Sequence, residues 1–125
     1  MRKKSLSILF FALLVLSACE RDTSYDAFTT CLADEGAVMY GAFWCPHCQD
    51  QKEMFGDSID LLPYVECDPN GKNAQAQLCV EKGVKSYPTW IIDESKVEVG
   101  LQSFEALSEL TSCPLPGNES VLLLN

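Results

Sequence analysis

Residues 37–55 read AVMYGAFWCPHCQDQKEMF. The run from Ala37 to Phe43 is continuously apolar, which is typical of a buried central strand. Pro46 suits the first turn of a helix, because its missing N–H would have no partner there, and no helix breaker follows before Gly56. We therefore expect a strand that leads directly into a helix, with Cys45-Pro46-His47-Cys48 at the junction.

The same reasoning extends to the rest of the chain. Helical spacing of apolar residues, together with capping residues, predicts helices over 24–35 and 74–82 and a last helix that begins after Ser103. Ser24 is a candidate N-cap of the first helix and Gly36 a candidate stop. Short apolar runs predict strands over 62–66, 87–92 and 96–99, the last two as a hairpin. This order predicts an α/β fold with a mixed four-stranded sheet flanked by helices.

The N-terminus has the layout of an export signal. Arg2, Lys3 and Lys4 precede an apolar run from Leu6 to Leu16 that is too short to span a membrane comfortably.

Leu16-Ser17-Ala18-Cys19 resembles the lipobox of bacterial lipoproteins, which implies that Cys19 carries lipid and holds the protein on the outer face of a bacterial membrane. On the periplasmic side of a Gram-negative cell, the membrane could be the inner or the outer one. An ordinary cleaved signal peptide is the alternative. We divide the chain into a signal peptide (1–18), a tether (19–24), one domain (25–113) and a tail (114–125).

The charge of the chain is strongly acidic. The full sequence has a net charge of −9, and removal of residues 1–18 takes away three cations and no acid, which gives −12. Such a surface argues against nucleic acid as a partner.

Cysteine usage points to oxidising surroundings. The chain has seven cysteines, and six remain once Cys19 is assigned to lipid. Cys67 and Cys79 bracket a turn and the start of a helix, so we expect them to form a structural disulfide. Cys31 and Cys113 are then left as a second pair, although a redox relay through Cys67 and Cys79 is an alternative.

Cys45 and Cys48 are the candidate catalytic residues. Thiol-disulfide exchange needs an accessible sulfur that is stabilised as a thiolate and a second thiol nearby to resolve the mixed disulfide. Cys45 would lie at a helix N-terminus, where free N–H groups favour an anion. His47 is the only histidine of the chain, and its imidazole could stabilise the Cys45 thiolate by charge or by a hydrogen bond. We expect no cofactor.

Zinc is the alternative for these sulfurs. Cys45, Cys48, Cys67 and Cys79 could form a four-thiolate site, and their spacing is not unusual for a zinc ribbon. Export and the proline between Cys45 and Cys48 favour redox chemistry, so we predict no metal.

Several motifs in order give a resemblance to a known family. The stretch from Tyr40 to Leu107 resembles the thioredoxin-like domain attached to, or partnered with, bacterial homologues of vitamin K epoxide reductase, a DsbA-like oxidoreductase with a Cys-Pro-His-Cys centre. The matching segments are 40–49 (YGAFWCPHCQ), 63–69 (PYVECDP), 77–79 (QLC), 87–90 (YPTW) and 102–105 (QSFE).

The resemblance implies a thioredoxin-like fold and oxidative protein folding. The domain would pass its disulfide to the thiols of secreted proteins and be reoxidised by a quinone-linked membrane enzyme of the vitamin K epoxide reductase type, here a separate protein. It also implies a cis peptide before Pro88, which faces the two cysteines, and a substrate surface that includes Trp44, Tyr87 and Pro88.

One departure from thioredoxin concerns proton transfer. Thioredoxin carries a buried acid six residues before its first active cysteine, and this chain has Met39 there. Proton transfer to Cys48 would then fall to another group or to water. A reductase or isomerase of the same fold, and a lipid-anchored binding module without catalysis, are the alternative functions.

Overall fold

The computed structural model describes residues 20–117. The expected signal peptide, the lipidation site Cys19 and most of the C-terminal tail lie outside these residues.

The centre of the fold is a mixed sheet with the strand order β2-β1-β3-β4. Strand β1 pairs in parallel with β2 and antiparallel with β3, and β3 pairs antiparallel with β4. The bounds are Ala37–Gly41 for β1, Tyr64–Glu66 for β2, Thr89–Ile92 for β3 and Lys96–Val99 for β4. The predicted four-stranded α/β sheet is confirmed, and the arrangement is compatible with a thioredoxin-like fold.

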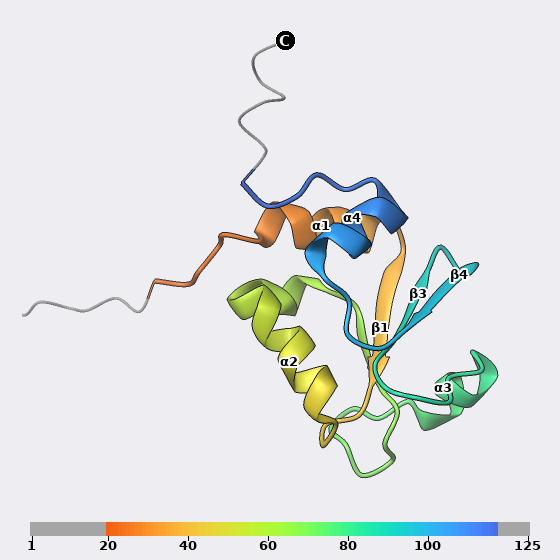
Figure 1. Cartoon of the computed structure of the whole chain (residues 1–125). Helices are drawn as coiled ribbons and strands as arrows, with labels where there is room; N and C mark the ends of the chain where they lie inside the picture. The colour runs from red at the N-terminus through yellow and green to blue at the C-terminus, as the bar shows by residue number, and fades with distance from the viewer. Residues whose placement is uncertain (1–19, 118–125) are drawn as a thin grey trace, which may run out of the picture.

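Helices cover both faces of this sheet (Figure 1). They are α1 (Asp26–Asp34), α2 (Pro46–Phe55), α3 (Ala76–Glu81) and α4 (Phe104–Thr111). Alternate strand residues separate the two cores, because successive side chains of a strand point to opposite faces. Met39 and Trp90 pack with residues of α1, α2 and α4. Tyr40 and Ile91 pack on the other face with Cys79 of α3.

The helix that carries the two cysteines has the predicted bounds. Helix α2 begins at Pro46 and ends at Phe55, and Gly56 follows with φ +54. A positive φ at this position favours glycine, which explains why the helix ends there.

One local prediction was wrong, and one element was not predicted. Ser24 is not an N-cap, because Tyr25 takes that position and the Ser24 hydroxyl donates to Asp22 instead. Residues 56–61 form a 3-10 helix that the sequence did not indicate, and it is held by the buried Ser58 hydroxyl, which donates to Asp26 over 2.6 Å.

Part of the segment 19–24, which we expected to be a tether, is bound to the domain. The Arg21 guanidinium donates to the Asp57 carbonyl over 3.0 Å, and the backbone N–H of Asp22 donates to the Asp57 carboxylate over 2.9 Å. The chain therefore enters the fold beside α1 and the 3-10 helix.

Candidate active site

Cys45 and Cys48 lie together where β1 leads into α2. Both thiols are unpaired. Cys45 is the N-cap of α2, and its sulfur accepts the backbone N–H of Cys48 over 3.3 Å. The sulfur thus occupies the place of an ordinary capping oxygen, among N–H groups that have no partner within the helix.

Cys45 is more deeply buried than the accessible sulfur we predicted. Only 4 % of the residue is exposed, and it packs in the core cluster with Cys48 and Trp90. The physical reason is the cap itself, because a sulfur that accepts the Cys48 N–H turns inward toward the helix. Its neighbours Trp44, Pro46 and His47 are all exposed, so the buried sulfur lies directly beneath the surface of the domain.

Cys48 is buried, and its thiol is held in the protonated form. Burial raises the pKa of the Cys48 thiol to about 12, and the hydrogen bond with Cys45 acts in the same direction. The positive charge of Lys52, one turn further along α2, opposes this shift only weakly. The two sulfurs therefore differ in environment, and Cys48 needs help to lose its proton at neutral pH.

His47 lies in solvent rather than against the sulfurs. Its side chain is 71 % exposed, and Nδ1 lies 3.7 Å from the Asp50 carboxylate. The hydrogen bond to Cys45 that we considered is not made, because the ring leaves the start of α2 toward Asp50. We considered two roles for His47, a hydrogen bond to Cys45 and an electrostatic effect on it. Only the electrostatic effect remains.

Of the predicted substrate residues, Tyr87 packs against the core cluster that contains both cysteines, and Pro88 is fully buried. The peptide bond between Tyr87 and Pro88 is cis, as the resemblance implied. The Trp44 ring meets the Tyr87 ring edge-on, with centroids 6.1 Å apart. The Trp44 indole N–H donates to Asp68 over 2.7 Å, which orients a ring that is otherwise 54 % exposed.

Asp68 is a residue of this site that the sequence did not reveal. The Asn70 backbone N–H and the Trp44 indole both donate to its carboxylate, and these hydrogen bonds hold the pKa of Asp68 below its usual range. A charged acceptor makes the hydrogen bond to Trp44 a strong one. The residue was missed because it lies far from Trp44 along the chain, in the loop after β2.

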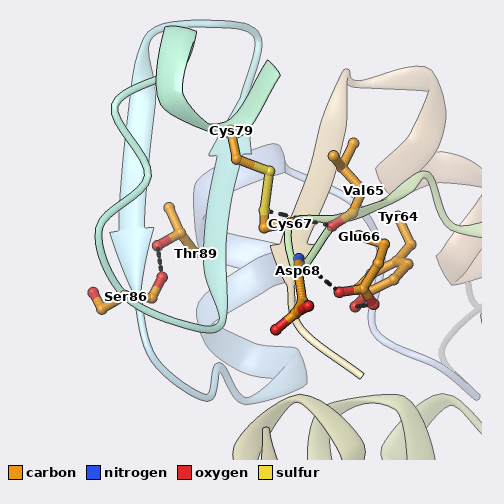
Figure 2. The surroundings of a disulfide bond; sticks show 8 residues. All are labelled: Tyr64, Val65, Glu66, Cys67, Asp68, Cys79, Ser86 and Thr89. Carbon is orange, nitrogen blue, oxygen red and sulfur yellow. Dashed lines mark hydrogen bonds between the residues drawn. A yellow bond between two sulfur atoms is a disulfide. The ribbon is translucent and has the colours of Figure 1, made fainter. Parts of the chain in front are cut away.

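A polar pair, the half-buried Tyr64 and the buried Glu66, also lies near Cys48. The Tyr64 hydroxyl donates to the Glu66 carboxylate over 2.9 Å, and Figure 2 shows the two side chains together at the end of β2. A Cβ atom built on Gly41 would lie 2.8 Å from Cys48 Sγ and 3.3 Å from the Tyr64 hydroxyl oxygen. The Cys48 thiol and the Tyr64 hydroxyl therefore both lie next to Gly41, where the backbone carries no side chain.

The pair was not found from the sequence, although a signal exists. Tyr64 and Glu66 are two residues apart in a strand, so they share one face of the sheet. An acid in such a short, mostly apolar strand directly after the redox motif could have been singled out.

Both expected structural disulfides are present. Cys67 is joined to Cys79 and Cys31 to Cys113, with Cα–Cα distances of 5.7 Å and 5.8 Å. Cys67 and Cys79 are bound to one another, so they are not available to complete a four-thiolate site with Cys45 and Cys48. Within residues 20–117, no group of three or more potential ligands is placed to hold a metal ion.

In the same range of residues, none of the helices has the length and apolar character that a membrane crossing requires.

Comparison with known proteins shows similarity to a plant oxidoreductase. The chain is 44 % identical over 84 residues to thiol-disulfide oxidoreductase LTO1 of Arabidopsis thaliana. The aligned region covers 64 % of this chain but only 22 % of that protein. The chain thus spans about a fifth of the relative's length. No family model matches the chain.

Proposed function

We propose that this protein is a thiol-disulfide oxidoreductase that donates disulfides to secreted proteins through Cys45 and Cys48. The observation that carries the proposal is the cap of α2, where the Cys45 sulfur accepts the Cys48 N–H at a helix N-terminus. Such a site favours the thiolate, the form that acts as nucleophile and as leaving group in disulfide exchange. The relative in Arabidopsis, named for this activity, supports the assignment.

The reaction begins with the oxidised pair. A substrate thiolate attacks Cys45 Sγ, the Cys45–Cys48 bond breaks, and Cys48 leaves as a thiolate that takes up a proton. A second substrate thiolate then attacks the substrate sulfur of the mixed disulfide, which forms the substrate disulfide and releases the Cys45 thiolate. Two electrons pass from the substrate to the pair, and the product is the dithiol form that the structure holds.

The substrate surface is formed by the exposed Trp44 and the half-buried Tyr87, whereas Pro88, which we also expected there, is fully buried. The exposed Trp44 ring is fixed by Asp68 and stands against Tyr87, next to Cys45. A rigid, exposed aromatic ring offers a large contact area to an unfolded chain at little cost in side-chain entropy. Protein thiols, rather than small thiols alone, are the substrates that fit this surface.

The cellular setting is part of the proposal. Cys19 carries lipid and holds the protein on the extracytoplasmic side of a bacterial membrane, periplasmic in a Gram-negative cell. In Figure 1 the described chain leads into α1 near one end of the domain, whereas α2 starts toward the other end. A quinone-linked membrane enzyme of the vitamin K epoxide reductase type reoxidises the pair.

The direct test is oxidation of a reduced protein. Oxidised full-length chain is mixed with reduced, unfolded ribonuclease A, and recovery of ribonuclease activity is followed together with loss of the Cys45–Cys48 disulfide. We expect stoichiometric transfer by the wild type and none by Cys45→Ser. Failure of the wild type to oxidise ribonuclease, or full activity of Cys45→Ser, would contradict the proposal.

The redox potential separates a donor from a reductase. Equilibration of the pair with glutathione buffers should give a value in the range of good oxidants, about −120 to −180 mV. A value near that of thioredoxin, about −270 mV, would identify a reductase instead. A pair that neither alkylates nor exchanges with glutathione would identify a binding module.

A further inference from the structure

The buried thiol of Cys48 needs a partner for its proton, and the Met39 side chain cannot provide one. In the reoxidation of the pair, Cys48 must lose its proton before it attacks Cys45. Met39 is fully buried in the core with a side chain that cannot take up a proton. The groups near Cys48 are Cys45 at the N-cap of α2, Lys52 of the same helix and Tyr64 of β2, and the Tyr64 hydroxyl donates in turn to Glu66.

We propose that Tyr64 and Glu66 are a proton relay for Cys48, in which the Tyr64 hydroxyl links the thiol to the Glu66 carboxylate. This inference rests on the proposed oxidoreductase function and assigns roles within the same site. Tyr64 is the residue next to the reacting sulfur, and Glu66 is a positioning residue that acts through it.

The hydrogen bonds of Glu66 set the direction of the relay. Its carboxylate accepts the Tyr64 hydroxyl over 2.9 Å and the backbone N–H of Asp68 over 2.9 Å (Figure 2). Both partners donate, so the side chain acts as an acceptor on both oxygens, which is the arrangement of an ionised carboxylate. With the hydroxyl hydrogen directed at Glu66, the Tyr64 oxygen keeps a free lone pair. In this structure it makes no hydrogen bond to the Cys48 thiol, but both groups border the Cβ position of Gly41, the sulfur at 2.8 Å and the hydroxyl oxygen at 3.3 Å, so the relay needs only a small approach of the two.

The transfer balances in both directions. When the pair is reoxidised, the Cys48 proton moves to the Tyr64 oxygen as the Tyr64 proton moves to Glu66, which leaves a Cys48 thiolate and a neutral Glu66. The thiolate attacks Cys45 Sγ in the mixed disulfide, the new disulfide forms, and the oxidant's thiolate leaves. When the pair donates its disulfide, the proton returns from Glu66 through Tyr64 to the departing Cys48 thiolate.

The surroundings fit a hydroxyl that passes a proton without ionising. Burial, followed by the hydrogen bond to Glu66, raises the pKa of Tyr64 above its usual range, so the hydroxyl keeps a proton at every working pH. The Lys52 ammonium lies 3.5 Å from the centre of the Tyr64 ring, where its charge favours a thiolate nearby.

Glycines make room for the relay at both ends. A Cβ on Gly71 would collide with the Glu66 side chain, and a Cβ on Gly41 would collide with the Cys48 sulfur. On the outer side, Tyr64 and Lys52 line an open pocket of about 370 Å³ that also includes Asp60. Solvent thus reaches the same tyrosine whose hydroxyl lies beside the thiol.

The test follows the step in which Cys48 must lose its proton. The reduced full chain is mixed with excess oxidised glutathione and quenched in acid at short times, and mass spectrometry measures glutathione bound to Cys45 and its conversion to the Cys45–Cys48 disulfide. The variants are Tyr64→Phe and Glu66→Gln. The matched controls are Tyr25→Phe and Glu98→Gln, which remove a hydroxyl and a carboxylate elsewhere on the domain.

We expect glutathione to add to Cys45 at the wild-type rate in both variants, because that step does not involve the Cys48 proton. Conversion to the disulfide should slow roughly tenfold or more at pH 7 in Tyr64→Phe and Glu66→Gln. Its rate should then rise in proportion to hydroxide over a wider pH range than in the wild type. The controls should match the wild type in both steps.

Every other result contradicts either the relay or the proposed function, and the two cases can be distinguished. Conversion at the wild-type rate with an unchanged pH profile overturns the relay, and so does a slower conversion with an unchanged profile, which indicates a structural effect only. Tyr64→Phe and Glu66→Gln are each compared with the wild type. If one of them misfolds, the other still tests the relay. Absence of any adduct on Cys45 in the wild type instead overturns the proposed function.

Discussion

The backbone N–H of Cys48 donates to the sulfur of Cys45 over 3.3 Å, although the Cys48 thiol is itself buried and difficult to ionise. The two cysteines of one motif are therefore unlike: one receives a hydrogen bond from the start of α2, and the other has a pKa raised by burial to about 12. This difference supports the proposed roles, in which Cys45 exchanges with the substrate and Cys48 carries out the internal step.

Alkylation of the reduced protein should reveal the difference. Iodoacetamide at pH 7 to 8 should modify Cys45, whereas Cys48 should stay unmodified until the pH is well above 9, because its thiol remains protonated below its raised pKa of about 12. Peptide mass spectrometry after a timed quench measures both sites. Unfolding in urea is the control and should make the two cysteines react alike; equal reaction in the folded protein would contradict the asymmetry.

The exposed Trp44 ring should matter for protein substrates more than for small ones. Trp44→Ala removes a ring that is fixed by Asp68 and packs against Tyr87, so we expect oxidation of reduced ribonuclease to slow by about tenfold, or 1.4 kcal/mol. Exchange with glutathione should change less than threefold. Val80→Ala, which trims an exposed apolar side chain of α3, is the matched control. Equal loss with both substrates would show that Trp44 supports the cysteines rather than the substrate.

The central part of the fold could be predicted closely from local signals. Pro46 and Gly56 bracket α2, and both bounds of that helix agree with the prediction. The strand Lys96–Val99 was also predicted to the residue, because an alternating run follows a turn directly after β3. In each case the deciding residues are neighbours along the chain.

The features that were missed depend on partners far apart in the sequence. The 3-10 helix over 56–61 is held through Ser58 by Asp26, a residue of the first helix. The relation of Tyr64 to Cys48 appears only when β2 pairs in parallel with β1, with Tyr64 opposite Met39 and its ring reaching along the strand to Gly41. No periodicity or spacing within one segment carries that information.

Gln51 is a further residue of this kind, and it should be important for stability. Its side chain is completely buried, and its amide joins α2 to the chain before α4 by accepting the Gln102 N–H over 2.7 Å and donating to the Gln102 carbonyl over 3.0 Å. The Trp90 indole donates to the same oxygen over 3.3 Å.

Gln51→Leu should lower the free energy of unfolding by about 2–4 kcal/mol, because it leaves the buried Trp90 indole N–H and the part-buried Gln102 N–H without an acceptor. Urea denaturation monitored by circular dichroism measures the change. Gln77→Leu, at an exposed position of α3, is the control and should stay within about 0.5 kcal/mol of the wild type. A loss below about 1 kcal/mol in Gln51→Leu would mean that water or a neighbouring group replaces the amide.

The two structural disulfides should contribute unequally. Cys31 and Cys113 are 82 residues apart, whereas Cys67 and Cys79 are 12 apart. In the chain-entropy model, the longer loop gives about 4–5 kcal/mol and the shorter one about 3 kcal/mol. The paired variants Cys31→Ala/Cys113→Ala and Cys67→Ala/Cys79→Ala, compared by urea denaturation, measure this order. A larger loss from the shorter loop would indicate that the Cys67–Cys79 bond stabilises the native site beyond its effect on the unfolded chain.

Gly41→Ala tests whether the space beside Cys48 is as restricted as the geometry indicates. The new Cβ would lie 2.8 Å from Cys48 Sγ and 3.1 Å from the Tyr64 ring, so one of these groups must move. We expect a loss of about 1–3 kcal/mol in stability and slower closure of the Cys45–Cys48 disulfide. In the background of Cys48→Ala, where the sulfur is gone, the same substitution should cost less, with a coupling of about 0.5 kcal/mol or more. Additive losses across the four proteins of this cycle would show that Gly41 and Cys48 do not compete for the same space, and the close approach of Tyr64 to the thiol would then need another explanation.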